Sequence, residues 1–108
     1  MPRRGEIWWV ALDPTVGSET RKTRPCVVVS VDILNERRKT VIVVPLSSSP
    51  KASPPIMIPV TCDGSPAVAV SDQLRAVAKE RLRTRLGILR DEEMSAIDDG
   101  IVQILGLG

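Results

Sequence analysis

The residues best suited to chemistry lie where two strand-like segments begin or end. Arg24 directly precedes Pro25 at the start of an apolar segment, so its guanidinium stands on a backbone that proline makes rigid. A guanidinium held in one place is well suited to binding a phosphate. Ser47 and Ser48 follow the next apolar segment, and their hydroxyls face Arg24 if the two segments pair as strands. An arginine paired with a nearby carboxylate, and serines that cap a turn, are the structural alternatives.

Composition excludes several kinds of catalytic centre. The 108 residues include no histidine, which removes Ser-His-Asp, Cys-His and His-ligated zinc-protease chemistry. They include no phenylalanine or tyrosine, so Trp8 and Trp9 are the only aromatic residues and a sheet paved with base-stacking rings is not available. Cys26 and Cys62 lack the spacing of metal ligands, so we expect neither a metal nor another cofactor. Cys26 lies within an apolar segment, where we expect a buried thiol and not a nucleophile.

Composition also bears on where the chain works. Hydrophobic residues make up 43% and charged residues 26%, which is typical of one globular domain spanning residues 1–108. No apolar run approaches the roughly 20 residues of a membrane-spanning helix, and the charged N-terminal segment lacks the apolar stretch of an export signal. Two cysteines are too few for a disulfide scaffold. We therefore expect a soluble, cytoplasmic protein with no membrane partner.

The charges are unevenly distributed along the chain. All 15 Lys and Arg residues lie in the first 90 positions, whereas five of the 13 Asp and Glu residues lie in the last 18. A basic body of this kind suits a polyanionic partner, because Lys and Arg contacts to phosphates release counterions. A mixed, solvated surface is the alternative that charge alone leaves open.

RNA is the polyanion whose cleavage fits this inventory. The 2′-hydroxyl of RNA can attack the neighbouring phosphorus and leave a cyclic phosphate, so neither a metal nor an enzyme nucleophile is required. The protein must align the hydroxyl, neutralise the phosphorane and assist the proton transfers. Arg24 suits the second task, the Ser47 hydroxyl can donate a hydrogen bond, and Glu19 is a candidate base. Composition and pattern alone indicate a basic, mostly β domain that is compatible with nucleic-acid binding.

The elements that position these residues are mostly short strands. β-Branched runs and alternating patterns, bounded by charged or turn residues, favour strands over helices. The proline at position 59 indicates an edge or a bulge in its strand. The expected strands are Gly5–Leu12, Pro25–Val31, Thr40–Leu46, Ile56–Thr61, Ala67–Ser71, Gln73–Val77 and Arg83–Leu89, with a short helix at Ala78–Leu82.

Two connections are longer than tight turns require. Residues 13–24 begin with an Asp-Pro turn signal and end in a basic cluster. Residues 45–55 contain four prolines and four serines, so we expect them not to pair as a strand. Long loops between short strands are frequent positions for functional sites, although a plain linker explains the second loop equally well.

The last element is an amphipathic helix. Asp91 suits the N-cap position, and Glu92 and Glu93 lie in the first turn, where the helix dipole favours negative charge. Apolar residues then recur at helical spacing, which predicts a helix packed on the sheet. Short strands with one terminal helix indicate a mostly β, α+β fold, more compatible with a small, strongly bent barrel than with a sandwich.

Several blocks of the chain resemble the MazF/PemK/Kid toxins of type II toxin–antitoxin modules. The blocks together span nearly the whole chain and are specific in combination. They are Arg4-Gly5-Glu6-Ile7-Trp8-Trp9-Val10 with Leu12-Asp13-Pro14, Gly17-Ser18-Glu19, Thr23 to Ser30, Val41 to Ser47, and Asp72 to Val77 with Lys79 to Leu82.

The resemblance implies an SH3-like barrel and a homodimeric, metal-independent endoribonuclease. Such an enzyme cuts single-stranded RNA at short sequences and leaves a 2′,3′-cyclic phosphate and a 5′-hydroxyl, which inhibits translation and growth. The family's catalytic arginine falls on Arg24 and its catalytic threonine on Ser47, which keeps the hydroxyl but lacks the methyl that restricts rotamers. Glu19 is implied as a base or a positioning residue. Residues implied in RNA binding are Arg21, Lys22, Thr23, Ser48, Gln73 and Arg75.

The implied partner is an antitoxin whose acidic, disordered C-terminal segment lies along the basic groove. Two alternatives remain open at this point. The same barrel occurs in CcdB-type toxins, which bind DNA gyrase and cleave nothing, and an RNA-binding barrel without catalysis is a further possibility. Trp8 and Trp9 are either core residues or contributors to a dimer interface.

Overall fold

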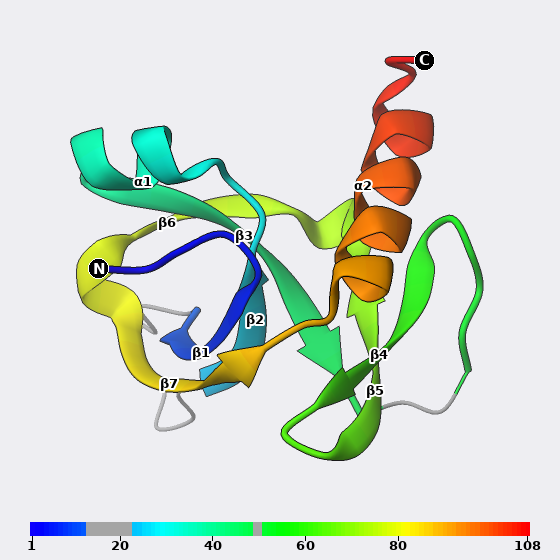
Figure 1. Ribbon diagram of the computed structural model, residues 1–108, viewed down its shortest axis with the longest axis horizontal. Helices are drawn as coiled ribbons and strands as arrows, with labels where there is room; N and C mark the ends of the chain where they lie inside the picture. Colours follow the sequence, from blue (N-terminus) through cyan, green and yellow to red (C-terminus); the bar gives the residue numbers. More distant parts are fainter. Residues whose placement is uncertain (13–22, 49–50) are drawn as a thin grey trace, which may run out of the picture.

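The chain folds into one curled antiparallel sheet with a long C-terminal helix (Figure 1). The computed structural model describes residues 1–12, 23–48 and 51–108. The elements in chain order are β1 (Glu6–Ala11), β2 (Thr23–Val28), α1 (Asp32–Arg37), β3 (Thr40–Ser47), β4 (Met57–Cys62), β5 (Ser65–Val70), the 3₁₀ turn η1 (Ser71–Gln73), β6 (Arg75–Ala78), the 3₁₀ turn η2 (Lys79–Arg81), β7 (Leu82–Ile88) and α2 (Asp91–Leu105). The prediction of a mostly β, barrel-like sheet with a C-terminal helix is confirmed.

β3 is the strand that organises the sheet. The strand order is β4-β5-β3-β2-β1-β7, and β6 also pairs with β3. The first half of β3 pairs with β6, for example Val41 with Val77, and its end pairs with β5, where Leu46 lies opposite Ala69. β4 is an edge strand, so the expectation that Pro59 marks an edge is confirmed.

The two faces of the curled sheet bury two separate cores. Side chains alternate along a strand, so neighbouring positions point to opposite faces. One core lies beneath α2 and includes Ile7, Val27, Val44, Leu46, Ile58, Met94 and Ile97. The other, called the second core below, lies on the opposite face, and Trp8 and Leu82 pack against it. Its buried residues are Val10, Leu12, Cys26, Val28, Val41, Val43 and Val77. Burying one such aliphatic side chain contributes about 1.5–3 kcal/mol.

The helix α1 was not predicted from the sequence. It has only six residues, which is too short for a helical repeat to show. Asn35 of this helix is fully buried, and its Nδ2 donates a 2.9 Å hydrogen bond to the Ser30 carbonyl. The Ser30 hydroxyl contacts the Asn35 side chain and accepts a 3.0 Å hydrogen bond from the Ile42 N–H. Tertiary hydrogen bonds therefore hold this short helix on the sheet.

We expected residues 45–55 not to pair as a strand, and this is wrong for the first three residues of the segment. Pro45, Leu46 and Ser47 belong to β3 and lie opposite Cys26, Ala69 and Val68. β6 pairs with β3 as far as Val43, and β5 begins to pair at Leu46. The missing N–H of Pro45 thus falls where β3 changes neighbours and the hydrogen-bond ladder is interrupted in any case.

Arg4 joins the N-terminal segment to both helices. Its backbone N–H donates a 2.7 Å hydrogen bond to Asp32 Oδ1 at the start of α1. Its guanidinium donates to the Val29 carbonyl and to the Asp98 carboxylate of α2. Because the Arg4 and Asp98 side chains are partly exposed, their ion pair adds little to the free energy of unfolding. Its main effect is to orient the N-terminal segment relative to α2. Among the described residues, no helix is both long enough and apolar enough to cross a membrane.

The predicted N-cap of the long helix is wrong by one residue. Asp91 is the first residue of α2, and Arg90 occupies the N-cap position. The buried Glu93 accepts a 3.1 Å hydrogen bond from the Arg90 N–H and a 2.7 Å bond from the Thr61 N–H of β4. Burial by itself raises the pKa of Glu93, but these hydrogen bonds and the Arg90 side chain outweigh it and hold the pKa below 4.5.

We predict that Glu93→Gln lowers the free energy of unfolding at pH 7 by about 1–3 kcal/mol, because a charge-assisted acceptor of two N–H groups is lost. Since the folded pKa lies below 4.5, the stabilisation is present above the unfolded pKa and is lost as the pH falls through the folded value. Urea denaturation between about pH 7 and pH 2 measures this. Glu92→Gln, at the exposed neighbouring position, is the matched control, and identical pH profiles for the two variants would contradict the assignment.

Candidate active site

The pairing of β2, β3 and β6 brings the predicted site residues to one face of the sheet. Val28 pairs with Val43 between β2 and β3, and Val43 pairs with Arg75 between β3 and β6. Residues directly opposite each other in a sheet share a face. By alternation along each strand, Arg24 lies on the face of Val28 and Ser47 on the face of Val43. The face shared by Arg24, Ser47 and Arg75 is therefore that of the second core.

The ends of the strands also coincide. Cys26 pairs with Pro45, and the same antiparallel register, continued by two residues, brings the start of β2 level with the end of β3. Arg24 is half-buried near the start of β2, and Ser47 is half-buried as the last residue of β3. The sequence-based expectation that these two strands pair is confirmed.

The buried thiol of Cys26 reports on the electrostatics of this place. Cys26 is fully buried, and burial raises its pKa to about 12, although the positive charges of Arg24 and Arg75 both oppose the shift. Two guanidiniums from different strands thus act on one group. Within the described residues, neither of them forms an ion pair with a carboxylate. Such a concentration of unpaired positive charge favours binding of an anion.

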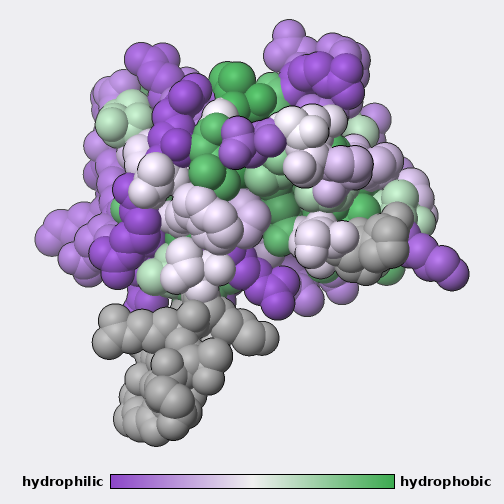
Figure 2. Space-filling view, turned by 90° about the horizontal axis from the view of Figure 1, so that it is seen from below, coloured by the Kyte–Doolittle hydropathy of each residue, from purple (hydrophilic) through white to green (hydrophobic). Residues whose placement is uncertain are grey.

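The remaining predicted residues are placed as follows. Thr23 is exposed as the first residue of β2, and Ser48 is exposed just beyond β3, so both lie at the same ends of the strands as Arg24 and Ser47. Gln73 is exposed in η1, not in a strand as predicted, because β6 begins only at Arg75. Glu19, Arg21 and Lys22 lie outside the described residues. Viewed from below, this end of the molecule is a mosaic of polar residues, in purple to white, with apolar green patches between them (Figure 2).

The available chemistry is that of guanidiniums and a hydroxyl. In the part of the chain that the structure describes, no group of three or more Cys, Asp or Glu side chains is arranged to hold a metal ion. A guanidinium can bind two phosphate oxygens at once and neutralise charge that develops on them. A serine hydroxyl can donate a hydrogen bond to the same group. Together these groups suit stabilisation of a phosphorane.

A second polar group was not singled out by sequence reasoning. The carboxylate of Glu6 is buried and accepts hydrogen bonds from Trp8 Nε1 and from Arg85 Nε, at 3.1 and 2.8 Å. The only local signal is an acidic residue within an otherwise apolar segment. The contact with Arg85 joins residues that are 79 positions apart, so no local pattern reveals it.

Comparison with known proteins shows the family. The family described as PemK-like, MazF-like toxin of type II toxin–antitoxin system matches residues 3–105. The chain belongs to this family of toxins. The endoribonuclease MazF9 of Mycobacterium tuberculosis is 36% identical over 110 residues, which cover 94% of this chain and 93% of that protein.

Solved structures agree on the fold. An endoribonuclease in complex with its cognate antitoxin from a mycobacterial species superposes with a TM-score of 0.84 at 21% identity, covering 100% of this chain and 98% of the other. MazF from Deinococcus radiodurans gives a TM-score of 0.82 at 21% identity, covering 98% and 97%. The family match and the likeness to MazF9 do not favour the CcdB-like alternative.

The two cysteines differ in burial, and this difference predicts how their thiols react. With a pKa of about 12, only about one in 10,000 Cys26 thiols is ionised at pH 8, and the group is fully buried. The half-buried Cys62 is accessible in comparison, although burial raises its pKa as well. Titration with an aromatic disulfide reagent at pH 8 should therefore detect one thiol in the folded protein and two after unfolding. The Cys62→Ser variant should show none while folded, and a reactive thiol in that variant would contradict the placement of Cys26.

Proposed function

We propose that this MazF-like toxin endoribonuclease cleaves single-stranded RNA in the cytoplasm without a metal ion, and so inhibits translation and growth. The observation that carries the proposal is the convergence of Arg24 and Arg75 beside Cys26, on the face that Ser47 shares. Membership of the toxin family and the likeness to MazF9 over nearly the whole chain support the same activity.

The reaction proposed is a transesterification within the RNA. The 2′-oxygen attacks phosphorus in line with the 5′-oxygen, so the 2′-O–P bond forms as the P–O5′ bond breaks. The products are a 2′,3′-cyclic phosphate and a 5′-hydroxyl. The 2′-hydroxyl loses a proton to a base, for which Glu19 is our candidate, and the leaving 5′-oxygen gains one. Arg24 stabilises the charge on the non-bridging oxygens, and Ser47 donates a hydrogen bond to one of them.

Further residues hold the RNA in the proposed complex. Arg75 brings a second positive charge to the same face, and Gln73 lies two residues before it in η1. Amide and hydroxyl groups can read the edges of unstacked bases, whereas lysine and arginine hold phosphates without regard to sequence. The remaining proposed RNA contacts are Arg21, Lys22, Thr23 and Ser48.

The partner that regulates the toxin is proposed to be an antitoxin with an acidic, disordered C-terminal segment. The solved mycobacterial relative was captured with its cognate antitoxin. In this chain, positive charge is confined to the first 90 residues, and α2 carries none. An acidic segment would therefore bind the face of Arg24 and Arg75 and exclude RNA from it.

We also propose that the toxin is a homodimer and that the apolar face beside α2 is its interface. A groove of about 430 Å³ runs along α2, with Val29, Ile42 and Leu74 among its lining residues. Large apolar residues around it are exposed, which is unusual for a monomeric surface. They are Val31, Ile33 and Leu34 near α1, and Val102, Leu105 and Leu107 near the end of α2.

Arg24→Ala is predicted to reduce RNA cleavage by roughly 100- to 1,000-fold, because a preorganised donor to the phosphorane is lost. The assay incubates purified protein with RNA in EDTA and detects fragments with cyclic-phosphate ends. Arg83→Ala removes an equal charge from an exposed position on β7 and should retain most of the activity. Full cleavage by Arg24→Ala would refute its role, and an inactive wild-type protein would favour a toxin that binds its target without cutting.

Leu105→Glu is predicted to raise the dissociation constant of the dimer at least roughly 100-fold, because a carboxylate would be buried in an apolar interface without a partner. Leu105 is 56% exposed in the single chain, so the substitution leaves the fold of the monomer intact. Sedimentation equilibrium measures the change. Ile88→Glu, at a 62% exposed position on β7, is the control and should remain dimeric. A monomeric wild-type protein, or an unaltered Leu105→Glu dimer, would contradict this interface.

A further inference from the structure

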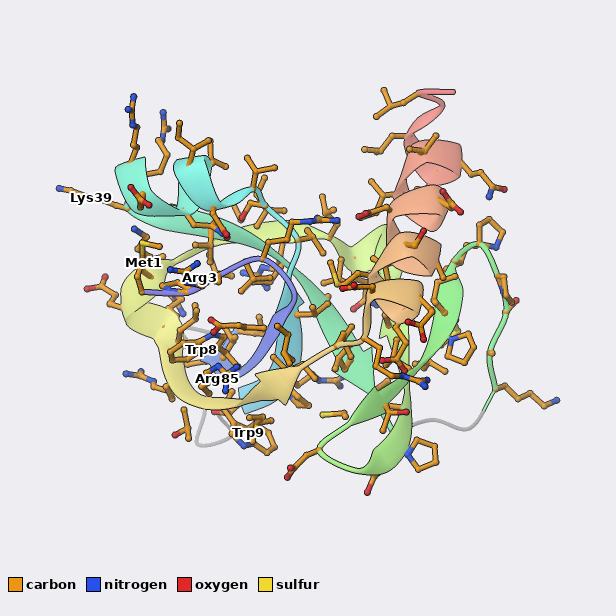
Figure 3. All side chains as sticks on the ribbon, in the orientation of Figure 1. Met1, Arg3, Trp8, Trp9, Lys39 and Arg85 are labelled. Carbon is orange, nitrogen blue, oxygen red and sulfur yellow. The ribbon has the colours of Figure 1, made fainter. Side chains whose placement is uncertain are left out.

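The buried carboxylate of Glu6 organises a cluster on the flank of the molecule away from α2. Its two oxygens accept hydrogen bonds from the Arg3 N–H at 2.8 Å, from Trp8 Nε1 at 3.1 Å and from Arg85 Nε at 2.8 Å. Burial opposes ionisation, but these donors hold the pKa of Glu6 below 4.5. Figure 3 shows Arg3, Trp8 and Arg85 on this same flank.

Arg85 is held in a geometry that leaves its outer edge available. Glu6 occupies the Nε side of the guanidinium, and the Arg85 side chain is still 48% exposed. No other hydrogen bond or ion pair of this side chain occurs within residues 1–12, 23–48 and 51–108. Because an internal carboxylate fixes Nε while about half of the side chain is exposed, little side-chain freedom remains to be lost when an anion binds.

Trp8 lies beside this guanidinium. It is directly opposite Arg85 in the pairing of β1 with β7, and its indole N–H is fixed by Glu6. Part of the ring packs against the second core, and the side chain as a whole is only half-buried. Proteins bind single-stranded nucleic acids mainly through aromatic rings, which stack on bases, and positive charges, which bind phosphates. A fixed, partly exposed ring next to a fixed guanidinium provides both.

The cluster is connected to the candidate active site through one strand pair. Trp8 lies opposite Cys26 in the pairing of β1 with β2, and Cys26 is the residue on which Arg24 and Arg75 converge. Neighbouring strands are about 4.8 Å apart, and only β1 separates β2, which carries Arg24, from β7, which carries Arg85. An RNA bound at Arg24 can therefore reach Arg85 within a few nucleotides. Arg3 is exposed on the same flank and adds positive charge.

We propose that Arg85 and Trp8 form an additional RNA subsite, in which the guanidinium binds a backbone phosphate and the indole stacks with an adjacent base. This proposal rests on the proposed ribonuclease function and extends its substrate path beyond the scissile phosphate. Glu6 is a positioning residue that orients both side chains. An acidic peptide would use the guanidinium but has no base to stack on Trp8, so RNA is the occupant that uses both groups.

The test measures binding of a 2′-O-methyl RNA pool of about ten nucleotides, which cannot be cleaved because its 2′-oxygen is blocked. Arg85→Ala should weaken binding about tenfold and reduce the slope of log affinity against log salt by about 0.7, the contribution of one phosphate contact. Arg83→Ala is the matched control, with the same charge change on the same strand. It should weaken binding less than threefold, and equal effects of the two variants would overturn the proposal.

A second measurement addresses Trp8 without replacing it. In a Trp9→Phe variant, Trp8 is the only tryptophan, so its fluorescence reports on stacking directly. Saturating RNA should quench this fluorescence, and Arg85→Ala should shift the quenching curve to about tenfold higher RNA concentration. Unchanged fluorescence at saturation would overturn the subsite, as would an Arg85→Ala variant that loses affinity for an acidic peptide but not for RNA.

The two proposals fail in different ways. Wild-type protein that cleaves natural RNA in EDTA, while Arg85→Ala and Arg83→Ala bind the analogue equally well, would refute the subsite alone. Wild-type protein that cuts no natural RNA, while the Trp9→Phe variant binds the analogue with quenching of Trp8, would refute the ribonuclease function and support the subsite.

Discussion

The antiparallel pairing of β3 with both β2 and β6 is the constraint on which the candidate site depends. Each pairing buries alternate residues, so a register shift of one residue would turn Cys26 or Val77 out of the second core. The burial of these apolar side chains, about 1.5–3 kcal/mol each, therefore selects the register. Arg24 lies two residues before Cys26 and Arg75 two residues before Val77, so each shares the face of a core residue, and the same register places two like charges beside one thiol. Charges that repel each other are held together by hydrophobic packing elsewhere on the same strands.

The surfaces of the molecule differ in chemistry along the same lines. The described basic residues all lie outside α2, which offers acidic residues and, near its end, exposed apolar ones. α2 is fixed relative to the sheet by Glu93, which bonds to β4, and by the contact of Asp98 with Arg4. We propose that one surface of this toxin receives RNA or an acidic antitoxin segment, and that another receives a second copy of the chain. The separation allows dimer formation and RNA binding to occur together.

Much of the fold was predictable, because short β-branched runs and the terminal helix carry strong local patterns. The burial of Cys26 and the edge position of Pro59 followed from the same reasoning. The errors arose where tertiary contacts decide. α1 depends on the buried Asn35, Pro45 is tolerated because β3 changes neighbours there, and the cap of α2 comes from Glu93 reaching back to Arg90. For the site, Arg24 and Ser47 were candidates because of their positions at strand ends, and a family resemblance then implied their catalytic roles. The approach of Arg75 to Cys26, and of Arg85 to Glu6, needs the register of distant strands and has no local signal.

In the proposed reaction, Arg24 and Ser47 hold the same phosphate. A crystal structure of the protein with an RNA whose attacking 2′-hydroxyl is replaced by hydrogen would show whether they do. We expect one phosphate with a non-bridging oxygen within about 3 Å of an Arg24 guanidinium nitrogen and another within about 3 Å of Ser47 Oγ, with Arg75 on the adjoining phosphate or base. A complex in which the scissile phosphate contacts neither side chain, or in which Arg24 and Ser47 bind different phosphates, would contradict it.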